Sequence, residues 1–255
     1  MDAPIQPIFL FADSQLLFWS EDGELFLDRA RQLLESTEPK AAYVGASNGD
    51  LPEFFELFRG AMQGIGISDC RMIPAEPSTE DLDFFDQADL ILLAGGDPER
   101  GWRCFESNGL KQKVVERYYS GCLLMGISAG AMQLGLQAFN EPAGNGADKE
   151  LETFETFKLI PLVIDVHDDP DWLRLHAVMP KVGDLIQGLG IPSGAGAIVH
   201  PDMTLEPVRR PLVELGVKNG EVRQSLVFPP GEEDGEAPDE APEATPLKLT
   251  AKSES

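Results

Sequence analysis

The chain has 255 residues and a formal charge of −24, from 20 basic and 44 acidic residues. An acidic surface of this kind repels nucleic-acid phosphates and anionic lipid, so the composition argues against nucleic acid and membranes as partners. The N-terminus, "MDAPIQPIFLFAD", has neither the basic residues nor the cleavage site of a signal peptide. Three widely spaced cysteines without a metal-ligand pattern favour reduced thiols in the cytoplasm and predict no metal site.

Apolar runs of strand length alternate with helical patterns over most of the chain. The expected strands are residues 8–12, 41–46, 70–75, 89–96 and 122–128, and each is followed by a helical pattern. The fourth helix is expected to run to about residue 119 and the fifth to residue 139. Continuous apolar strands, each followed by a helix, predict a parallel sheet covered by helices on both faces.

The pattern changes after residue 139. A polar loop is expected at 140–150, a strand at 157–167 and a helix over about 171–188. The last apolar segments, 212–217 and 221–228, flank the hairpin signal Lys218-Asn219-Gly220. We therefore predict one α/β domain over 1–230, a three-layer αβα fold with a mostly parallel central sheet and a small antiparallel C-terminal hairpin. Residues 231–255 are acidic and lack aromatic residues, which predicts a disordered tail.

The segment "GISAG" places Ser128 between an expected buried strand and a helix. It has two interpretations. In a nucleophile elbow, a sharp turn with small neighbours lifts the serine hydroxyl above the sheet, and the following amide, that of Ala129, forms half of an oxyanion hole. The adjacent loop would supply the other half from Gly96 or Asp97. Alternatively, Ser128 simply caps the helix that follows.

A serine nucleophile needs a base, and the chain has three histidines. His167 ends a strand at the edge where the other candidate loops lie. His176 falls inside an expected helix, and His200 precedes Pro201 at a strand end, where a turn role is equally plausible. The pattern favours His167 but leaves a structural role open for it.

Several motifs together resemble one enzyme family. The segments "LILLAGGDPER", "LLMGISAGAM" and "LVIDVHDDPDWLRLHAVM" have the order and spacing of the cyanophycinase and aspartyl dipeptidase (peptidase E) family. "GLGIPSGAGAIV" is similar to the family's Gly-Ile-Gly-Ile stretch. The resemblance covers roughly residues 5–200, and it implies a glutamine-amidotransferase-like fold with serine in place of cysteine.

The resemblance also implies an activity and a set of site residues. The reaction is hydrolysis of a peptide or isopeptide bond near an aspartyl residue of a small peptide, through an acyl-enzyme and without metal or cofactor. The implied residues are Ser128 as nucleophile, His167 as base, Gly96 and Ala129 as oxyanion-hole amides, and Asp97, Asp165 and Arg174 as substrate-binding residues. A homodimer and a monomer both remain open.

The group that orients His167 is the least defined part of this site. Ser193 stands where cyanophycinase-like members have an acid. Asp168 and Asp169 are too close to His167 along the chain for an orienting contact to be predicted. Glu141 lies in the loop region from which aspartyl dipeptidases draw their acid, so we expect Glu141 to be the third catalytic residue.

Two other functions remain open on the sequence alone. A relative with an impaired site could bind a small ligand or a partner, which the altered acid position favours. An α/β-hydrolase esterase would share the GxSxG pattern and the order of serine before histidine, although the chain lacks an HGGG-type loop.

Overall fold

The computed structural model describes residues 4–140, 151–167 and 170–230. The expected acidic tail, 231–255, therefore lies outside the described residues, as do Glu141, Asp168 and Asp169. In the part of the chain that is described, no helix has the length and apolar character needed to cross a membrane.

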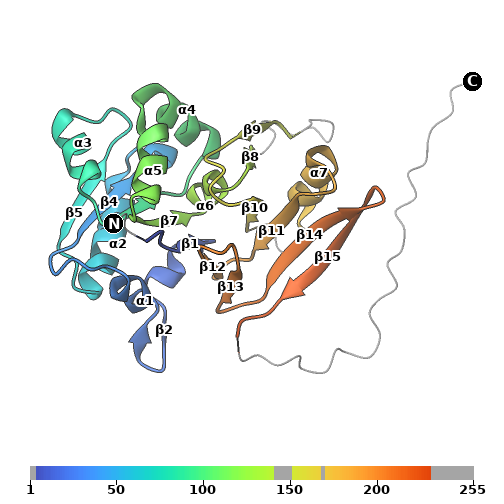
Figure 1. The fold of residues 1–255 in the computed structure, drawn as a ribbon, viewed down its shortest axis with the longest axis horizontal. Coiled ribbons are helices and arrows are strands. Elements are labelled where there is room, and N and C mark those ends of the chain that lie inside the picture. Colours follow the sequence, from blue (N-terminus) through green and yellow to red (C-terminus); the bar gives the residue numbers. More distant parts are fainter. Residues whose placement is uncertain (1–3, 141–150, 168–169, 231–255) are drawn as a thin grey trace, which may run out of the picture.

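The main sheet has seven strands in the order β13-β12-β1-β7-β6-β4-β5 (Figure 1). Its parallel strands are β1 (Ile8–Phe11), β4 (Lys40–Val44), β5 (Asp69–Ile73), β6 (Leu90–Leu93) and β7 (Leu123–Ile127). β12 (Gly196–Val199) and β13 (Leu205–Val208) add antiparallel strands beyond β1. The carboxyl ends of the parallel strands share one edge, which is where ligands bind in open α/β sheets.

Helices cover both faces of this sheet because successive strand residues point to opposite sides. Ile8 and Leu10 pack into a core with the helices of one face, and Phe9 and Phe11 pack into the core of the other. The first face carries α3 (Thr79–Asp86), α4 (Pro98–Asn108), α5 (Leu110–Tyr119) and α6 (Ala129–Leu134), and the second carries α1 (Asp28–Gln32) and α2 (Pro52–Gly64). The predicted three-layer α/β fold with a mostly parallel sheet is confirmed.

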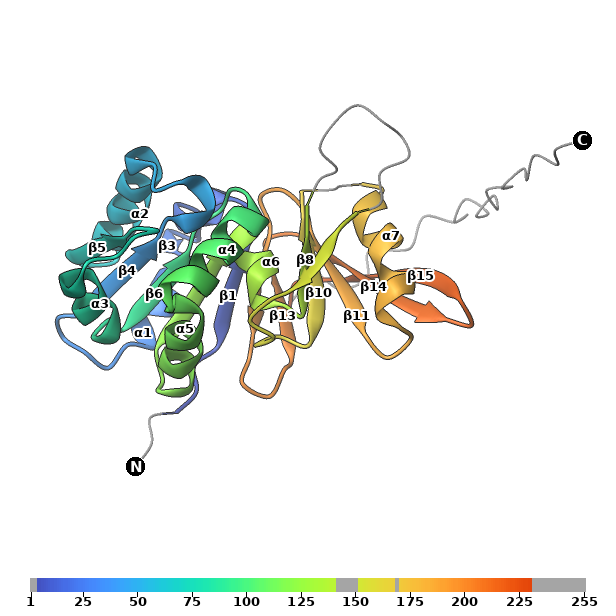
Figure 2. The ribbon, with the colours of Figure 1, turned by 90° about the horizontal axis from the view of Figure 1, so that it is seen from above.

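A second, four-stranded sheet lies beside the first (Figure 2). It comprises β10 (Leu162–Val166), β11 (Gln187–Ile191), β14 (Leu212–Lys218) and β15 (Glu221–Val227), with α7 (Leu173–Val182) packed on it. The expected hairpin joins β14 to β15 through Asn219 and Gly220, both at positive φ. A continuous core cluster includes buried side chains of both sheets.

Several predicted helix boundaries are wrong. The helix expected to run to residue 119 is broken at Gly109, whose φ of 80° ends α4. The helix after Ser128 ends at Leu134, because Gln137–Phe139 instead forms β8, which pairs with β9 (Thr153–Glu155). The helix expected over 171–188 ends at Val182. The remaining short elements are η1 (Ser14–Leu17), β2 (Ser20–Glu21), β3 (Glu24–Leu25) and η2 (Ala46–Asn48).

Candidate active site

Ser128 lies at the sharp turn between β7 and α6. Its φ of 50° and ψ of −112° put a non-glycine residue in a rarely populated backbone region, and its side chain makes no capping hydrogen bond to α6. Strained residues of this kind concentrate at functional sites. The Ser128 side chain therefore does not cap α6, and the tight turn with small neighbours is of the kind that a nucleophile elbow requires.

The two glycines of this elbow allow the close approach of strand and helix. A Cβ on Gly130 would lie 2.1 Å from the carbonyl oxygen of Leu93 on β6. A Cβ on Gly126 would lie 2.7 Å from the backbone nitrogen of Ala131. Real Cβ atoms do not approach backbone this closely, so a side chain at either position would push α6 away from the sheet.

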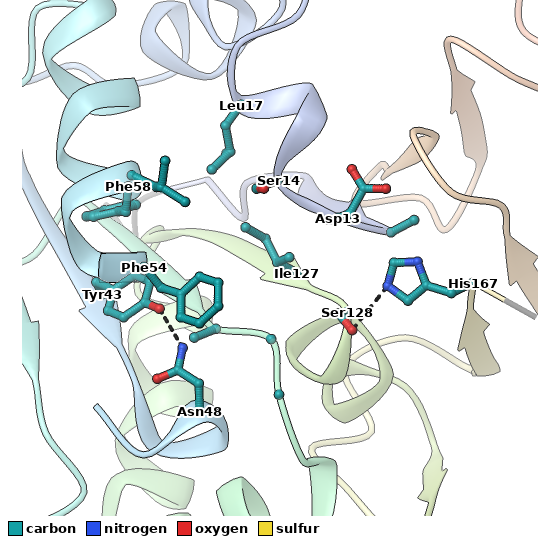
Figure 3. Close-up of a pocket in the computed structure, with 15 residues that line it drawn as sticks. Asp13, Ser14, Leu17, Tyr43, Asn48, Phe54, Phe58, Ile127, Ser128 and His167 are labelled. Atoms are coloured by element: carbon teal, nitrogen blue, oxygen red, sulfur yellow. Dashed lines mark hydrogen bonds between the residues drawn. The ribbon is translucent and has the colours of Figure 1, made fainter. Parts of the chain in front are cut away.

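The second sheet positions His167 beside Ser128. His167 follows β10, and its Nε2 lies 3.3 Å from the Ser128 hydroxyl oxygen (Figure 3). The other two histidines lie elsewhere: His176 contacts Gln224 at 3.4 Å, and His200 contacts Glu206 at 3.0 Å. Of the three histidines, His167 is the one that contacts Ser128.

The pKa of His167 is lowered from its ordinary value near 6.5. The main cause is desolvation of the imidazolium by the surrounding chain, although the residue as a whole still reaches solvent. The Asp13 carboxylate opposes this effect and raises the pKa, while the Arg174 guanidinium lowers it. His167 is therefore mostly neutral at neutral pH, as a general base must be.

The other ring nitrogen of His167 contacts a hydroxyl group. Its Nδ1 lies 3.3 Å from the Oγ of Ser193, in the loop between β11 and β12. Several contacts hold this loop: among them, the Asp13 carboxylate accepts a hydrogen bond from the Gly194 amide at 2.7 Å, and Arg210 donates to the Ser193 carbonyl at 2.6 Å. Sequence reasoning missed Asp13, although its place directly after β1 at the carboxyl edge of the sheet is a usable signal.

The predicted oxyanion-hole amides belong to Ala129, which follows Ser128 in the chain, and to Gly96, which lines the same cavity as Ser128. Ala129 begins α6, so its amide has no intrahelical partner. Gly96 has a φ of 130° in the loop after β6. The Asp97 amide donates to the Ser47 carbonyl at 2.9 Å, and the Asp97 side chain accepts from the Arg100 amide. Of the two residues expected to offer an amide from this loop, Gly96 lines the cavity beside Ser128, whereas Asp97 uses its amide on Ser47 and its carboxylate to cap α4.

Asp165 and Arg174 contact each other rather than the cavity beside Ser128. Asp165 is fully buried next to the last residue of β10, and its carboxylate accepts a hydrogen bond from Arg174 at 2.9 Å. Arg174 also donates to the Val166 carbonyl at 2.8 Å. Neither residue lines the cavity. Their positions fit an ion pair that supports the strand leading to His167, and do not support the predicted contact with substrate.

A cavity of about 260 Å³ begins at Ser128 and His167 and extends toward α2 (Figure 3). Its lining includes Gly95 and Gly96 of the loop after β6 and Asp13 after β1. Across the described ranges, the His, Cys, Asp and Glu side chains form no group that could hold a metal ion. The arrangement has what acyl transfer would need: a strained serine, a histidine in contact with it and a cavity meet at one sheet edge.

Comparison with known proteins decides the family. The sequence model of peptidase family S51 matches residues 10–176, a segment that contains both Ser128 and His167. The chain belongs to peptidase family S51. The predicted resemblance is therefore confirmed. No curated protein matches the chain.

Two solved structures share the fold of this S51 chain. A peptidase from an acI-B1 Actinobacterium is 17% identical, with a TM-score of 0.59 over 88% of this chain and 97% of its own. A Listeria monocytogenes EGD-e protein assigned to peptidase E is 12% identical, with a TM-score of 0.52 over 88% of this chain and 100% of its own. At these identities the likeness supports the fold alone.

Proposed function

We propose that this S51 chain is a serine peptidase that hydrolyses peptide or isopeptide bonds of short peptides through an acyl-enzyme on Ser128. The observation that carries the proposal is the 3.3 Å contact between His167 Nε2 and the hydroxyl oxygen of a strained elbow serine. A nucleophile within hydrogen-bond reach of its base is the signature of covalent catalysis, and this pair lies at the carboxyl edge of the main sheet, where open α/β sheets bind ligands.

In the acylation step, Ser128 Oγ attacks the carbonyl carbon of the substrate while His167 Nε2 takes the hydroxyl proton. The negative charge that develops on the carbonyl oxygen is stabilised by the amides of Ala129 and Gly96. His167 then gives its proton to the leaving nitrogen as the C–N bond breaks. The amine departs, and the acyl group stays on Ser128.

In the deacylation step, His167 removes a proton from water, which attacks the ester carbonyl. The proton then returns to Ser128 Oγ as the ester bond breaks and the carboxylic acid leaves. In both steps His167 must hold its proton on Nδ1, so that Nε2 is free to accept. The Ser193 hydroxyl, 3.3 Å from Nδ1, accepts that proton's hydrogen bond, and the Asp13 charge stabilises the imidazolium that forms.

Reactivity of Ser128 toward a fluorophosphonate tests this proposal. Fluorophosphonates modify serine only when a base activates it, so the expected result is labelling of Ser128, located by peptide mass analysis. The variant Ser128→Ala should not be labelled, whereas Ser120→Ala, which removes an exposed hydroxyl after α5, should be labelled as fast as the parent chain.

A relative that binds a ligand without hydrolysing it is the second candidate, because Ser193 and not a carboxylate contacts His167 Nδ1 among the described residues. The two candidates differ in this experiment. An intact, folded chain whose Ser128 stays unlabelled, and which cleaves none of a panel of dipeptides, would support the binding protein and contradict the peptidase.

A further inference from the structure

The cavity beside Ser128 is lined mostly by apolar side chains. Leu17 comes from η1, and Phe54, Leu57 and Phe58 come from α2 (Figure 3). Phe58 is buried, but Phe54 and Leu57 are 47% and 43% exposed. Large apolar side chains that meet solvent at the mouth of a cavity are typical of ligand sites, where a bound apolar group would cover them.

The charge of the cavity is the second observation. Among the described residues that line it, the ionisable side chains other than tyrosine are Asp13 and His167, and there is no lysine or arginine. Arg100 lies beside Gly49, outside the lining. A substrate carboxylate in this cavity would lose its water without gaining a cation, and it would share the space with Asp13. Burying an unpaired charge next to a like charge is strongly unfavourable.

The polar groups at the far end of the cavity are neutral. Asn48 donates from Nδ2 to the Tyr43 hydroxyl at 2.8 Å, and its Oδ1 accepts from the Leu51 amide at 3.2 Å. Burial raises the pKa of Tyr43 to about 12, so the phenol stays protonated at neutral pH. The Tyr43–Asn48 pair therefore offers no charge to a carboxylate.

The size of the cavity limits what it can hold. Its volume of about 260 Å³ lies just below the range of about 300–1,000 Å³ for sites that enclose a whole small molecule. A cavity of this size, opening at the nucleophile, suits a single large side chain next to the scissile bond.

We infer that this cavity binds a neutral side chain, aromatic or large aliphatic, on the substrate residue that acylates Ser128, and that it disfavours an aspartyl side chain there. The inference rests on the proposed function, because it takes Ser128 as the atom that carries the acyl group. It replaces the aspartyl preference that the family resemblance implied. The chemistry of the substrate class is therefore short peptides with an apolar residue at the cleaved carbonyl.

Amino-boronic acids test this inference. Unlike a substrate, they carry no leaving group that could itself fill the cavity. These analogues bond reversibly to an activated serine and present one side chain. The full chain is incubated with the boronic acid analogues of phenylalanine, leucine, asparagine or aspartate, and the concentration that halves fluorophosphonate labelling of Ser128 is measured. Asparagine matches aspartate in shape and lacks its charge.

We expect the phenylalanine and leucine analogues to halve the labelling at concentrations at least tenfold lower than the concentration of the aspartate analogue that does so. The asparagine analogue should need an intermediate concentration. Equal or stronger protection by aspartate would overturn the inference. Labelling that none of the analogues affects would overturn it too. Failure of Ser128 to be labelled at all is a different outcome, because it removes the proposed function itself.

Two variants that each add a positive charge test whether this cavity sets the preference for a neutral side chain. Leu57→Arg adds a cation at the cavity lining, and the half-exposed position of Leu57 leaves room for it. This variant should change the ratio of the half-protecting concentrations of the aspartate and phenylalanine analogues at least tenfold, in favour of aspartate. Leu51→Arg is the matched control, because Leu51 is 44% exposed at the start of α2 and does not line the cavity. The same shift in both variants, or in neither, would contradict the assignment of this cavity.

Discussion

The carboxylate of Asp13 accepts a hydrogen bond from the amide of Gly194 at 2.7 Å, which joins the end of β1 to the loop between the two sheets. This loop carries Ser193, whose hydroxyl contacts His167. Asp13 therefore acts on His167 in two ways: it fixes the loop that orients the ring, and its charge favours the protonated ring. In serine hydrolases that have a triad, a single acid performs both tasks.

Replacing Ser128 by alanine should lower kcat by at least about 10³-fold, because it removes the hydroxyl that His167 Nε2 contacts and that would carry the acyl group. The fold should persist, since alanine suits a tight turn and the Ser128 side chain caps nothing. Peptide hydrolysis and thermal unfolding of the same preparation measure both effects. Hydrolysis at the parent rate, from a variant with an unchanged melting temperature, would place the nucleophile elsewhere.

Replacing Ser193 by alanine should lower kcat about three- to tenfold, which corresponds to the loss of one neutral hydrogen bond of about 0.5–1.5 kcal/mol. The binding of a boronic acid analogue should change less, because Ser193 acts through His167.

Glu141→Gln, measured beside Ser193→Ala, tests the sequence-based prediction that Glu141 orients His167. If Glu141 is that acid, its amide variant should lose about 10³-fold or more in kcat, as expected when a carboxylate that fixes the histidine tautomer is neutralised. A Glu141→Gln variant that hydrolyses peptides at the parent rate would leave Ser193 and Asp13 as the groups that act on His167.

The pH dependence of kcat/KM should report His167, with an acid limb below the ordinary histidine pKa of about 6.5. Activity should rise with pH through that limb, because the base is the neutral ring. Asp13→Asn keeps an oxygen acceptor for Gly194 but removes the charge that raises the pKa of His167. The acid limb should therefore move to lower pH, and kcat at neutral pH should fall.

Asp184→Asn, which neutralises an exposed acid in the loop after α7, is the control for this pH profile. It removes the same formal charge from the chain. If it moves the acid limb as far as Asp13→Asn does, the effect belongs to net charge and not to the contact of Asp13 with the site.

Replacing Gly130 by alanine should destabilise the fold by about 3 kcal/mol, since the new Cβ would overlap the backbone of β6. Gly216→Ala is the matched control, because a Cβ on Gly216 in β14 meets nothing within 4 Å. Chemical denaturation of both variants gives the two free energies of unfolding. Equal stabilities would show that α6 can move away from the sheet at no cost.

The sequence by itself determined the parallel sheet, the tight turn at Ser128 and the place of His167 at the end of a strand. These features are local: a continuous apolar strand, a turn that needs small residues, and a histidine at a strand end each leave a pattern within a few residues. The same reasoning failed at the helix ends near Leu134 and Val182, where apolar runs continue into strands β8 and β11. Helical and extended apolar runs look alike until strand pairing distinguishes them.

Only the tertiary structure decided which groups surround His167. Asp13 lies 154 positions before His167, and Ser193 lies 26 positions after it. No local sequence pattern links the three residues. The packing of the two sheets brings them together, just as it pairs Arg174 with Asp165 and leaves the cavity without a cation among the described residues that line it. Contacts between distant segments depend on how whole layers pack, and the spacing of residues along one segment carries no record of that packing.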